Sequence, residues 1–293
     1  MINKFRAIFL FPGVILLMSL LLPGETAAFK DSAGSFDSIP KKSGTGIHPA
    51  VKPLLQAYSG YIDSIANGWI YWKDKSKMPF HNEANEKLNP SKLSKKEYEK
   101  YLNAISPAQM VVFDYPYLKP ISDPPKNFDP GRARNSDFMK KVYGGSEGEV
   151  RKRLKKVVWL RKKVNKVLLV NGENGAAASL QKISDELDKL PKKFMKYLDN
   201  PAGTFVWRPI AGTKRLSAHS FAIAIDINVN QSHYWRSSSP DKSGHYKFKN
   251  RIPFEIVEIF ERNGWIWGGR WYHYDTMHFE YRPEVVKRFL IDR

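Results

Sequence analysis

Cysteine is absent from all 293 residues of the sequence. No disulfide can therefore stabilise the fold, and no cysteine can carry a lipid anchor. Stability must instead come from a buried core or from bound ligands such as metal ions. The sequence supplies material for such a core in its eight Trp, fourteen Tyr and seventeen Phe residues.

Long apolar runs are also lacking, except near the N-terminus. Residues 7–22 are mostly apolar and follow two basic residues, but Pro12 and Gly13 interrupt them, so the run is too short for a comfortable membrane span. Small residues then lead up to Ala28. We therefore predict a signal peptide over residues 1–28 and an exported protein that is periplasmic or associated with the cell wall. An uncleaved N-terminal anchor is the alternative interpretation.

Acidic residues are scarce, because 29 Asp and Glu stand against 48 Lys and Arg and give a formal net charge of +19. Such a charge favours anionic partners through long-range attraction. The predicted export argues against nucleic acid, so we expect no nucleic-acid partner. Peripheral contact with an anionic wall polymer or membrane surface is one explanation of the charge, and solubility alone is the other.

Composition divides the rest of the chain into three regions. Residues 29–46 are rich in Ser, Gly, Lys and Asp, which predicts a flexible lead-in. Residues 47–145 mix aromatic clusters with turn-rich segments, which predicts a helical and loop-rich N-terminal region. Residues 146–293 contain the clearest periodic elements and all the motifs discussed below, so we expect them to form the domain that carries the functional site.

Capping residues and apolar periodicity predict the individual elements. Ser94 and Ser146 are each followed three residues later by Glu, as in capping boxes at helix starts. The expected helices cover residues 94–105, 146–156, 176–190 and 253–263, and a last helix begins at Pro283. The expected strands in the middle of the chain cover residues 157–159 and 167–170.

The segment at residues 215–228 contains the first group of residues suited to chemistry. It reads Arg-Leu-Ser-Ala-His-Ser-Phe-Ala-Ile-Ala-Ile-Asp-Ile-Asn, and from residue 223 onward large apolar side chains alternate with small or polar ones. This alternation predicts a strand with one apolar and one polar face. The apolar face is expected to hold Ile223, Ile225, Ile227 and Val229, and the polar face Ala224, Asp226 and Asn228.

Asp226 needs a partner in this setting, because an unpaired carboxylate on a buried strand is very costly. A metal ion would satisfy it, with His219 as a second ligand. In a fully extended chain, His219 would lie more than about 20 Å from Asp226, whereas ligand bonds are only about 2 Å long. We therefore expect His219 on a loop that folds back over the strand. Alternatively, His219 is a hydrogen-bonded core residue and Asp226 caps a turn.

A second segment, residues 265–281, supplies the remaining parts of a metal site. Its last residues alternate between apolar and polar side chains, so we expect His278 on a strand and Asp275 on the turn just before it. Together, His219, Asp226 and His278 would leave the fourth tetrahedral position of a zinc ion open, as in catalytic zinc sites. Asp275 could then accept a proton from water whose pKa the metal lowers.

The two segments together resemble the metal-binding motifs of the M15 family, which contains D-Ala-D-Ala carboxypeptidases and L-alanyl-D-glutamate endopeptidases. In that family the zinc site is formed by Ser-x-His, an Asp seven residues after that His, and a carboxylate three residues before a final His. The resemblance is firm from about Phe205 to Pro283. The matching residues here are Ser217, His219, Asp226, Asp275 and His278.

The resemblance implies a Zn²⁺ cofactor held by His219, Asp226 and His278, with Asp275 as the catalytic base. An Asp rather than a Glu at the base position is similar to the branch of the family that includes phage and bacterial endopeptidases. One position departs from the family pattern. Ala222 stands where Gly is usual, and its methyl group could crowd the loop unless the backbone there tolerates a side chain.

Members of the family also use an Arg on the strand before the first His to bind the substrate carbonyl or carboxylate. Residues 205–208 resemble the end of that strand, which makes Arg208 the expected catalytic arginine and Arg215 its rival. If neither has this role, both pair with surface carboxylates. Further residues expected to bind substrate are Ser217, Trp271 and His273.

These features predict an α+β fold. The resemblance implies a small antiparallel sheet with packed helices, similar to Hedgehog and DD-peptidase domains, behind the helical and loop-rich N-terminal region. It further implies a zinc peptidase that acts on peptidoglycan stem peptides, either at the terminal D-Ala or at the L-Ala-D-Glu bond. The alternative is a catalytically inactive metal-binding or wall-binding module of the same fold. The sequence leaves the cleaved bond and the oligomeric state open.

Overall fold

The computed structural model describes residues 47–242 and 244–291. The expected signal peptide, residues 1–28, and the expected lead-in, residues 29–46, lie outside the described residues, so both remain predictions. Within the described ranges, no helix is both long enough and apolar enough to span a membrane.

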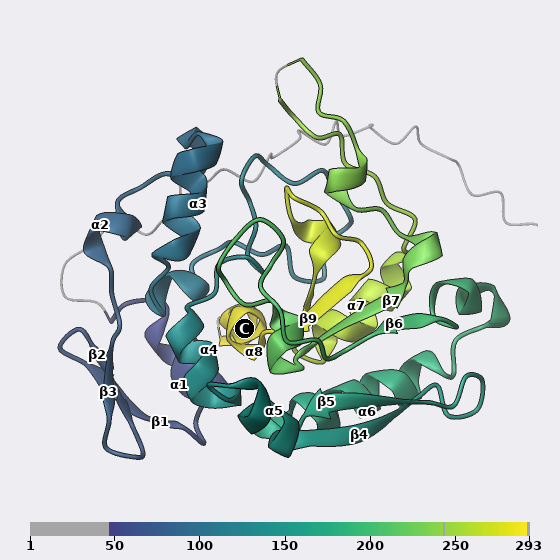
Figure 1. Cartoon of the computed structure of the whole chain (residues 1–293), viewed down its shortest axis with the longest axis horizontal. Coiled ribbons are helices and arrows are strands. Elements are labelled where there is room, and N and C mark those ends of the chain that lie inside the picture. Colours follow the sequence, from purple (N-terminus) through teal and green to yellow (C-terminus); the bar gives the residue numbers. More distant parts are fainter. Residues whose placement is uncertain (1–46, 243, 292–293) are drawn as a thin grey trace, which may run out of the picture. The chain divides into compact units, whose positions relative to one another are not determined.

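The first region contains short helices and a small sheet (Figure 1). The sheet was not expected from the sequence, although Asn67 and Gly68, at φ angles of 52° and 77°, form a hairpin turn of a kind that Asn-Gly commonly makes. Its antiparallel strands are β1 (Ile62–Ala66), β2 (Trp69–Trp72) and β3 (Lys77–Pro79). The helices are α1 (Val51–Ala57), α2 (Glu83–Glu86), α3 (Lys95–Asn103) and α4 (Ser136–Tyr143).

The capping box predicted at Ser94 is confirmed at the start of α3. The Ser94 Oγ accepts a hydrogen bond from the Glu97 N–H at 3.4 Å, and the Glu97 carboxylate accepts one from the Ser94 N–H at 2.9 Å. This arrangement satisfies two backbone donors that the helix itself leaves unpaired.

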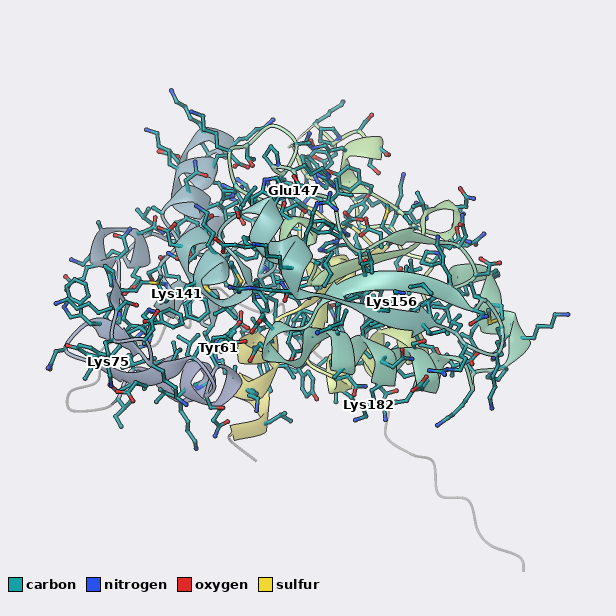
Figure 2. The ribbon with its side chains drawn as sticks, turned by 60° about the horizontal axis from the view of Figure 1, so that its bottom comes forward. Tyr61, Lys75, Lys141, Glu147, Lys156 and Lys182 are labelled. Atoms are coloured by element: carbon teal, nitrogen blue, oxygen red, sulfur yellow. The ribbon has the colours of Figure 1, made fainter. Side chains whose placement is uncertain are left out.

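The middle of the chain forms a hairpin packed against a helix. Helix α5 (Glu147–Arg153) is shorter than the helix expected over residues 146–156, because strand β4 (Leu154–Trp159) begins directly after it. β4 pairs antiparallel with β5 (Lys166–Asn171), and the pairing extends back to Leu154. Helix α6 (Ala176–Leu187) lies beside the hairpin, as Figure 2 shows with Lys156 and Lys182 labelled.

A four-stranded antiparallel sheet carries the two motif segments. Its strand order is β6-β7-β9-β8, and the register pairs Asp226 with His278. Val229 is a correction to the expected apolar face, because β7 ends at Asn228 and the Val229 side chain is 45% exposed. The strands are β6 (Pro201–Gly203), β7 (Ala224–Asn228), β8 (Trp265–Trp267) and β9 (His278–Tyr281), and the last two helices are α7 (Phe254–Arg262) and α8 (Pro283–Ile291).

Helices and small antiparallel sheets together confirm the α+β fold class. One continuous cluster of buried side chains extends from Ala50 to Phe279 and includes residues from both predicted regions. Both α7 and α8 contact β8 at the edge of the sheet. The boundary proposed between residues 145 and 146 remains a prediction.

Candidate metal centre

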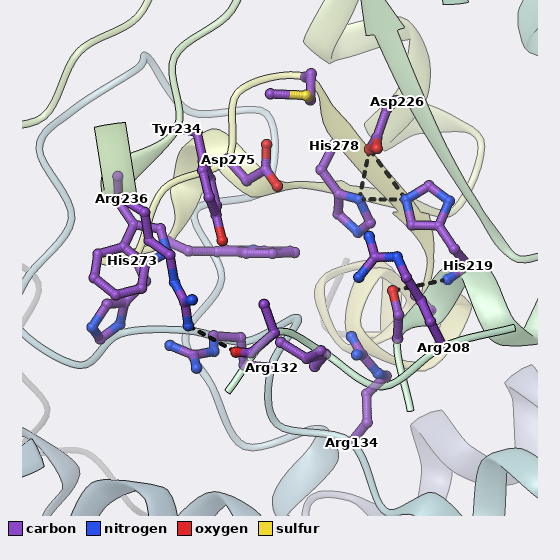
Figure 3. A pocket seen from close by; sticks show the side chains of 17 residues that line it. Arg132, Arg134, Arg208, His219, Asp226, Tyr234, Arg236, His273, Asp275 and His278 are labelled. Carbon is purple, nitrogen blue, oxygen red and sulfur yellow. Dashed lines mark hydrogen bonds and ion pairs between the residues drawn. The ribbon is translucent and has the colours of Figure 1, made fainter. Parts of the chain in front are cut away.

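The three predicted metal ligands lie together at β7 and β9 (Figure 3). Asp226 and His278 are partners on adjacent strands, and His278 Nδ1 lies 2.9 Å from Asp226 Oδ1. His219 lies on the short 3-10 helix Ala218–Phe221, and its Nε2 is 3.2 Å from each of those two atoms. The predicted return of His219 toward the strand is therefore confirmed.

The chain reverses direction at Ala222, the position where the family usually has Gly. Ala222 has φ 53° and ψ 37°, which lie in the left-handed region. Its N–H donates to the His219 carbonyl at 3.1 Å, and its carbonyl accepts from the Asn171 N–H at 2.9 Å. The turn thus requires a positive φ, which costs an alanine about 1–2 kcal/mol and which glycine adopts readily.

The geometry of the cluster fits a zinc ion. Tetrahedral zinc with bonds of about 2.0–2.1 Å places neighbouring ligand atoms roughly 3.3 Å apart. The three ligand atoms here are separated by 2.9, 3.2 and 3.2 Å. Two imidazoles and one carboxylate are also donor types found in catalytic zinc sites, where three protein ligands leave one position open.

The outer nitrogen of each imidazole faces a hydrogen-bond acceptor. His219 Nδ1 lies 3.2 Å from the Thr204 carbonyl, and His278 Nε2 lies 3.3 Å from the Glu280 carboxylate. An N–H donated to each acceptor leaves the inner nitrogen free to bind a cation, as outer partners do in metal sites. Glu280 is fully buried and is held in turn by Arg134 at 2.7 Å and by Arg282 at 3.1 Å.

The clustered side chains change each other's ionisation. Burial opposes a charge on Asp226, but His219 and His278 outweigh it and lower the pKa of Asp226 below its usual value. Burial also opposes a charge on His278, but Asp226 and Glu280 outweigh it and raise the pKa of His278 to about 10. A proton on His278 and a bound cation would therefore compete for the same nitrogen.

Asp275 lies on the turn before β9, beside the three ligands (Figure 3). Burial and the nearby Asp226 raise the pKa of Asp275 to about 7, although His278 and Arg208 oppose the shift. Its Oδ1 is buried and has no hydrogen-bond partner among the described residues. A buried carboxylate oxygen without a partner is costly, and such groups occur at functional sites.

One pocket of about 370 Å³ contains the three ligands and Asp275. Of the residues predicted to contact substrate, four also line this pocket: Arg208, Ser217, Trp271 and His273. The pocket therefore brings together almost all of the residues selected from the sequence.

The two candidate arginines have different surroundings. Arg208 is exposed, lines the pocket and takes part in no ion pair among the described residues. It lies on an extended loop, so the strand expected at residues 205–208 is wrong. Arg215 lies outside this pocket, where its guanidinium is 3.0 Å from Glu99 and donates to Asn103 at 2.7 Å.

The other three candidates are held by specific contacts. Ser217 caps the 3-10 helix by accepting a hydrogen bond from the His219 N–H at 3.3 Å. His273 Nδ1 lies 2.7 Å from the carboxylate of Asp129, which is fully buried. The Trp271 ring meets the His278 ring edge-on with centroids 5.4 Å apart.

Several pocket residues were not identified from the sequence. Arg236 donates to the Ala211 carbonyl at 2.8 Å and lies over the Trp235 ring, and none of the ion pairs between described residues includes it. Strand alternation could have identified Glu280, which shares a face with His278. No sequence signal links the others to the motifs. The missed residues that line the pocket include Arg132, Arg134, Tyr234 and Arg236.

Comparison with known families finds a similarity over the part of the chain that carries the site. Residues 211–281 match the model of a family described as D-alanyl-D-alanine carboxypeptidase. Searches of curated proteins and of solved structures gave no match. The matched range contains all three clustered residues and Asp275, so this part of the chain is similar to that peptidase family at the site itself.

Proposed function

We propose that this chain is an exported, zinc-dependent peptidase that hydrolyses peptide bonds in the stem peptides of peptidoglycan. The observation that carries the proposal is the convergence of His219, Asp226 and His278 beside a buried carboxylate, Asp275, that has an unpaired oxygen. The family match supports peptidase activity. The zinc ion, the wall substrate and the export are our proposals.

Each residue of the pocket then has a specific task. His219, Asp226 and His278 would hold zinc, which when bound supplies Lewis-acid activation of water and of the scissile carbonyl. Asp275 takes a proton from the attacking water and passes it to the leaving amine, a role suited to a buried carboxylate with an unpaired oxygen next to the three ligands. Arg208 stabilises the negative charge that develops on the carbonyl oxygen.

The unpaired arginines of the pocket favour a peptide that carries carboxylates. Arg208 and Arg236 both line the pocket, and neither forms a close ion pair with a carboxylate of the described residues. Guanidinium groups bind carboxylates strongly because they offer paired donors. Stem peptides provide such groups, whether cleavage releases the terminal D-Ala or separates L-Ala from D-Glu.

Digestion of purified muropeptides tests the proposal and identifies the bond. The protein with added zinc should shorten the peptides, and mass spectrometry should show loss of either the terminal alanine or a larger fragment. A chelator should abolish the reaction, and His219→Ala should lose zinc and activity together. Unchanged peptides in the presence of bound zinc would contradict the peptidase proposal.

A second candidate function is an inactive metal-binding or wall-binding module of the same fold. The observation that favours it is Ala222, because its left-handed backbone departs from the glycine that the family usually has there. Such a module would bind zinc and sediment with isolated peptidoglycan but release no product. The digestion described above therefore separates the two candidates.

A further inference from the structure

The β4–β5 hairpin and its flanks carry a basic surface that the proposed peptidase does not use. Residues 151–169 contain nine Lys and Arg and no Asp or Glu. Of these nine, only Arg151 joins an ion pair in the described part of the chain, with Glu147. The charges of the other eight therefore lack a carboxylate partner there.

The outer face of this hairpin carries exposed aliphatic side chains together with Lys156. Its inner face packs on α6, where Val157, Trp159, Leu168 and Val170 are buried. On the outer face, Val167 is 53% exposed and Leu169 is 42% exposed. The cross-strand partner of Val167 is Val158, and that of Leu169 is Lys156.

This pattern departs from that of an ordinary surface hairpin. An antiparallel hairpin that packs one face on a core usually presents polar side chains on the other face. Here four aliphatic side chains share the outer face, and basic residues flank them. Exposed aliphatic clusters with a polar rim are typical of interaction sites, because water disfavours apolar surface.

We propose that this surface binds a bilayer containing anionic phospholipid. Aliphatic side chains enter the headgroup region while Lys and Arg contact lipid phosphates, which is how interfacial segments combine the two forces. A soluble polyanion would engage the basic residues and leave Val167 and Leu169 in water. The hairpin face consists of Leu154, Lys156, Val158, Val167 and Leu169; Lys152 precedes β4 at the end of α5, and Arg161 and Lys162 lie in the turn that follows β4.

The hairpin face is separate from the candidate metal centre. No residue in the range 151–169 lines the pocket that contains His219, Asp226 and His278. Figure 2 shows Lys156 on the hairpin, whereas the metal ligands lie on β7, β9 and the preceding 3-10 helix. The inference therefore does not depend on the proposed peptidase activity.

A fluorescent label on the full chain tests the inference. Because the sequence has no cysteine, Val167→Cys gives one attachment point for an environment-sensitive dye. Leu88→Cys is the matched control, since Leu88 is 39% exposed and lies outside the hairpin. Vesicles of phosphatidylcholine with phosphatidylglycerol should shift the emission of the dye at residue 167 to shorter wavelength and leave that at residue 88 unchanged. An equal response at both positions, or none at residue 167, would overturn the proposal.

Charge and apolar variants separate a bilayer from a soluble polyanion. Combining Lys152→Glu, Lys156→Glu and Arg161→Glu should weaken binding to these vesicles at least about tenfold. The control combines Lys73→Glu, Lys87→Glu and Lys96→Glu, which changes the net charge by the same amount. It should weaken vesicle binding less than about threefold.

The apolar test combines Val167→Ser with Leu169→Ser, which keeps all charges. This pair should also weaken vesicle binding. If charge reversal weakens binding and the serine pair does not, the hairpin face is a site for a soluble polyanion and the bilayer proposal is wrong.

Discussion

Glu280 contacts His278, one of the three proposed metal ligands. Replacing Glu280 therefore measures how much the surrounding fold supports this ligand. The Glu280 carboxylate is fully buried, 3.3 Å from His278 Nε2, 2.7 Å from Arg134 and 3.1 Å from Arg282. Burial opposes its charge, but Arg134, His278 and Arg282 lower its pKa to about 2. Glu280 therefore orients one ligand and neutralises two buried guanidinium groups.

Glu280→Gln keeps the shape of the side chain but removes its charge. Arg134 then loses its carboxylate partner in the interior, so we expect the free energy of unfolding to fall by about 3 kcal/mol. The imidazole of His278 also loses a charged acceptor, so zinc affinity should fall about 10-fold to 100-fold. Urea unfolding of the zinc-free protein measures the first effect, and zinc titration against a competing chelator measures the second.

Glu284→Gln is the matched control for this prediction. Glu284 is also fully buried and also pairs with Arg282, but its other partner is Tyr58 rather than His278. It should reduce stability and leave zinc affinity within about twofold of the parent, because His278 keeps its charged acceptor. If Glu280→Gln likewise leaves zinc affinity unchanged, Glu280 stabilises the fold only, and the argument that it supports the metal ligand is refuted.

Three further predictions concern the pocket. Asp275→Asn should keep zinc content, measured by elemental analysis, but lower kcat at least about 100-fold because the proton acceptor is lost; retained turnover would remove Asp275 from the mechanism. Arg208→Ala should lower kcat/KM about tenfold or more, whereas Arg215→Ala should lower the unfolding midpoint and change kcat/KM less than about threefold; equal effects on kcat/KM would contradict these assignments. Because the pKa of His278 is raised to about 10, zinc must displace its proton at neutral pH, so apparent zinc affinity should fall as pH falls. Calorimetric titration in two buffers of different ionisation enthalpy should show proton release, and its absence would mean that His278 is already neutral.

The ligand set could be predicted because it depends on local spacing and strand alternation. His219 is seven residues before Asp226, and in an extended strand this separation is far longer than two metal–ligand bonds can span. A turn between the two residues was therefore required, and Ala222 makes it. The alternation of β7 placed Asp226 on a polar face, and only Val229, beyond the end of the strand, was assigned wrongly.

The rest of the pocket could not be predicted, because it depends on contacts between distant segments. Arg134 and Glu280 are 146 residues apart in sequence, and Asp129 and His273 are 144 residues apart. The region that supplies Arg134 and Asp129 contains no recognisable motif. The resemblance favoured Arg208 over its rival Arg215, and the structure distinguishes them further because Glu99 on α3 pairs with Arg215 only.

The alanine at position 222 can be judged by comparing energies. Its left-handed backbone costs about 1–2 kcal/mol relative to an unstrained residue. Zinc binding to structural sites in small peptides contributes about 10–16 kcal/mol near neutral pH. The strain is therefore too small to keep His219 away from a metal ion that Asp226 and His278 would hold on paired strands.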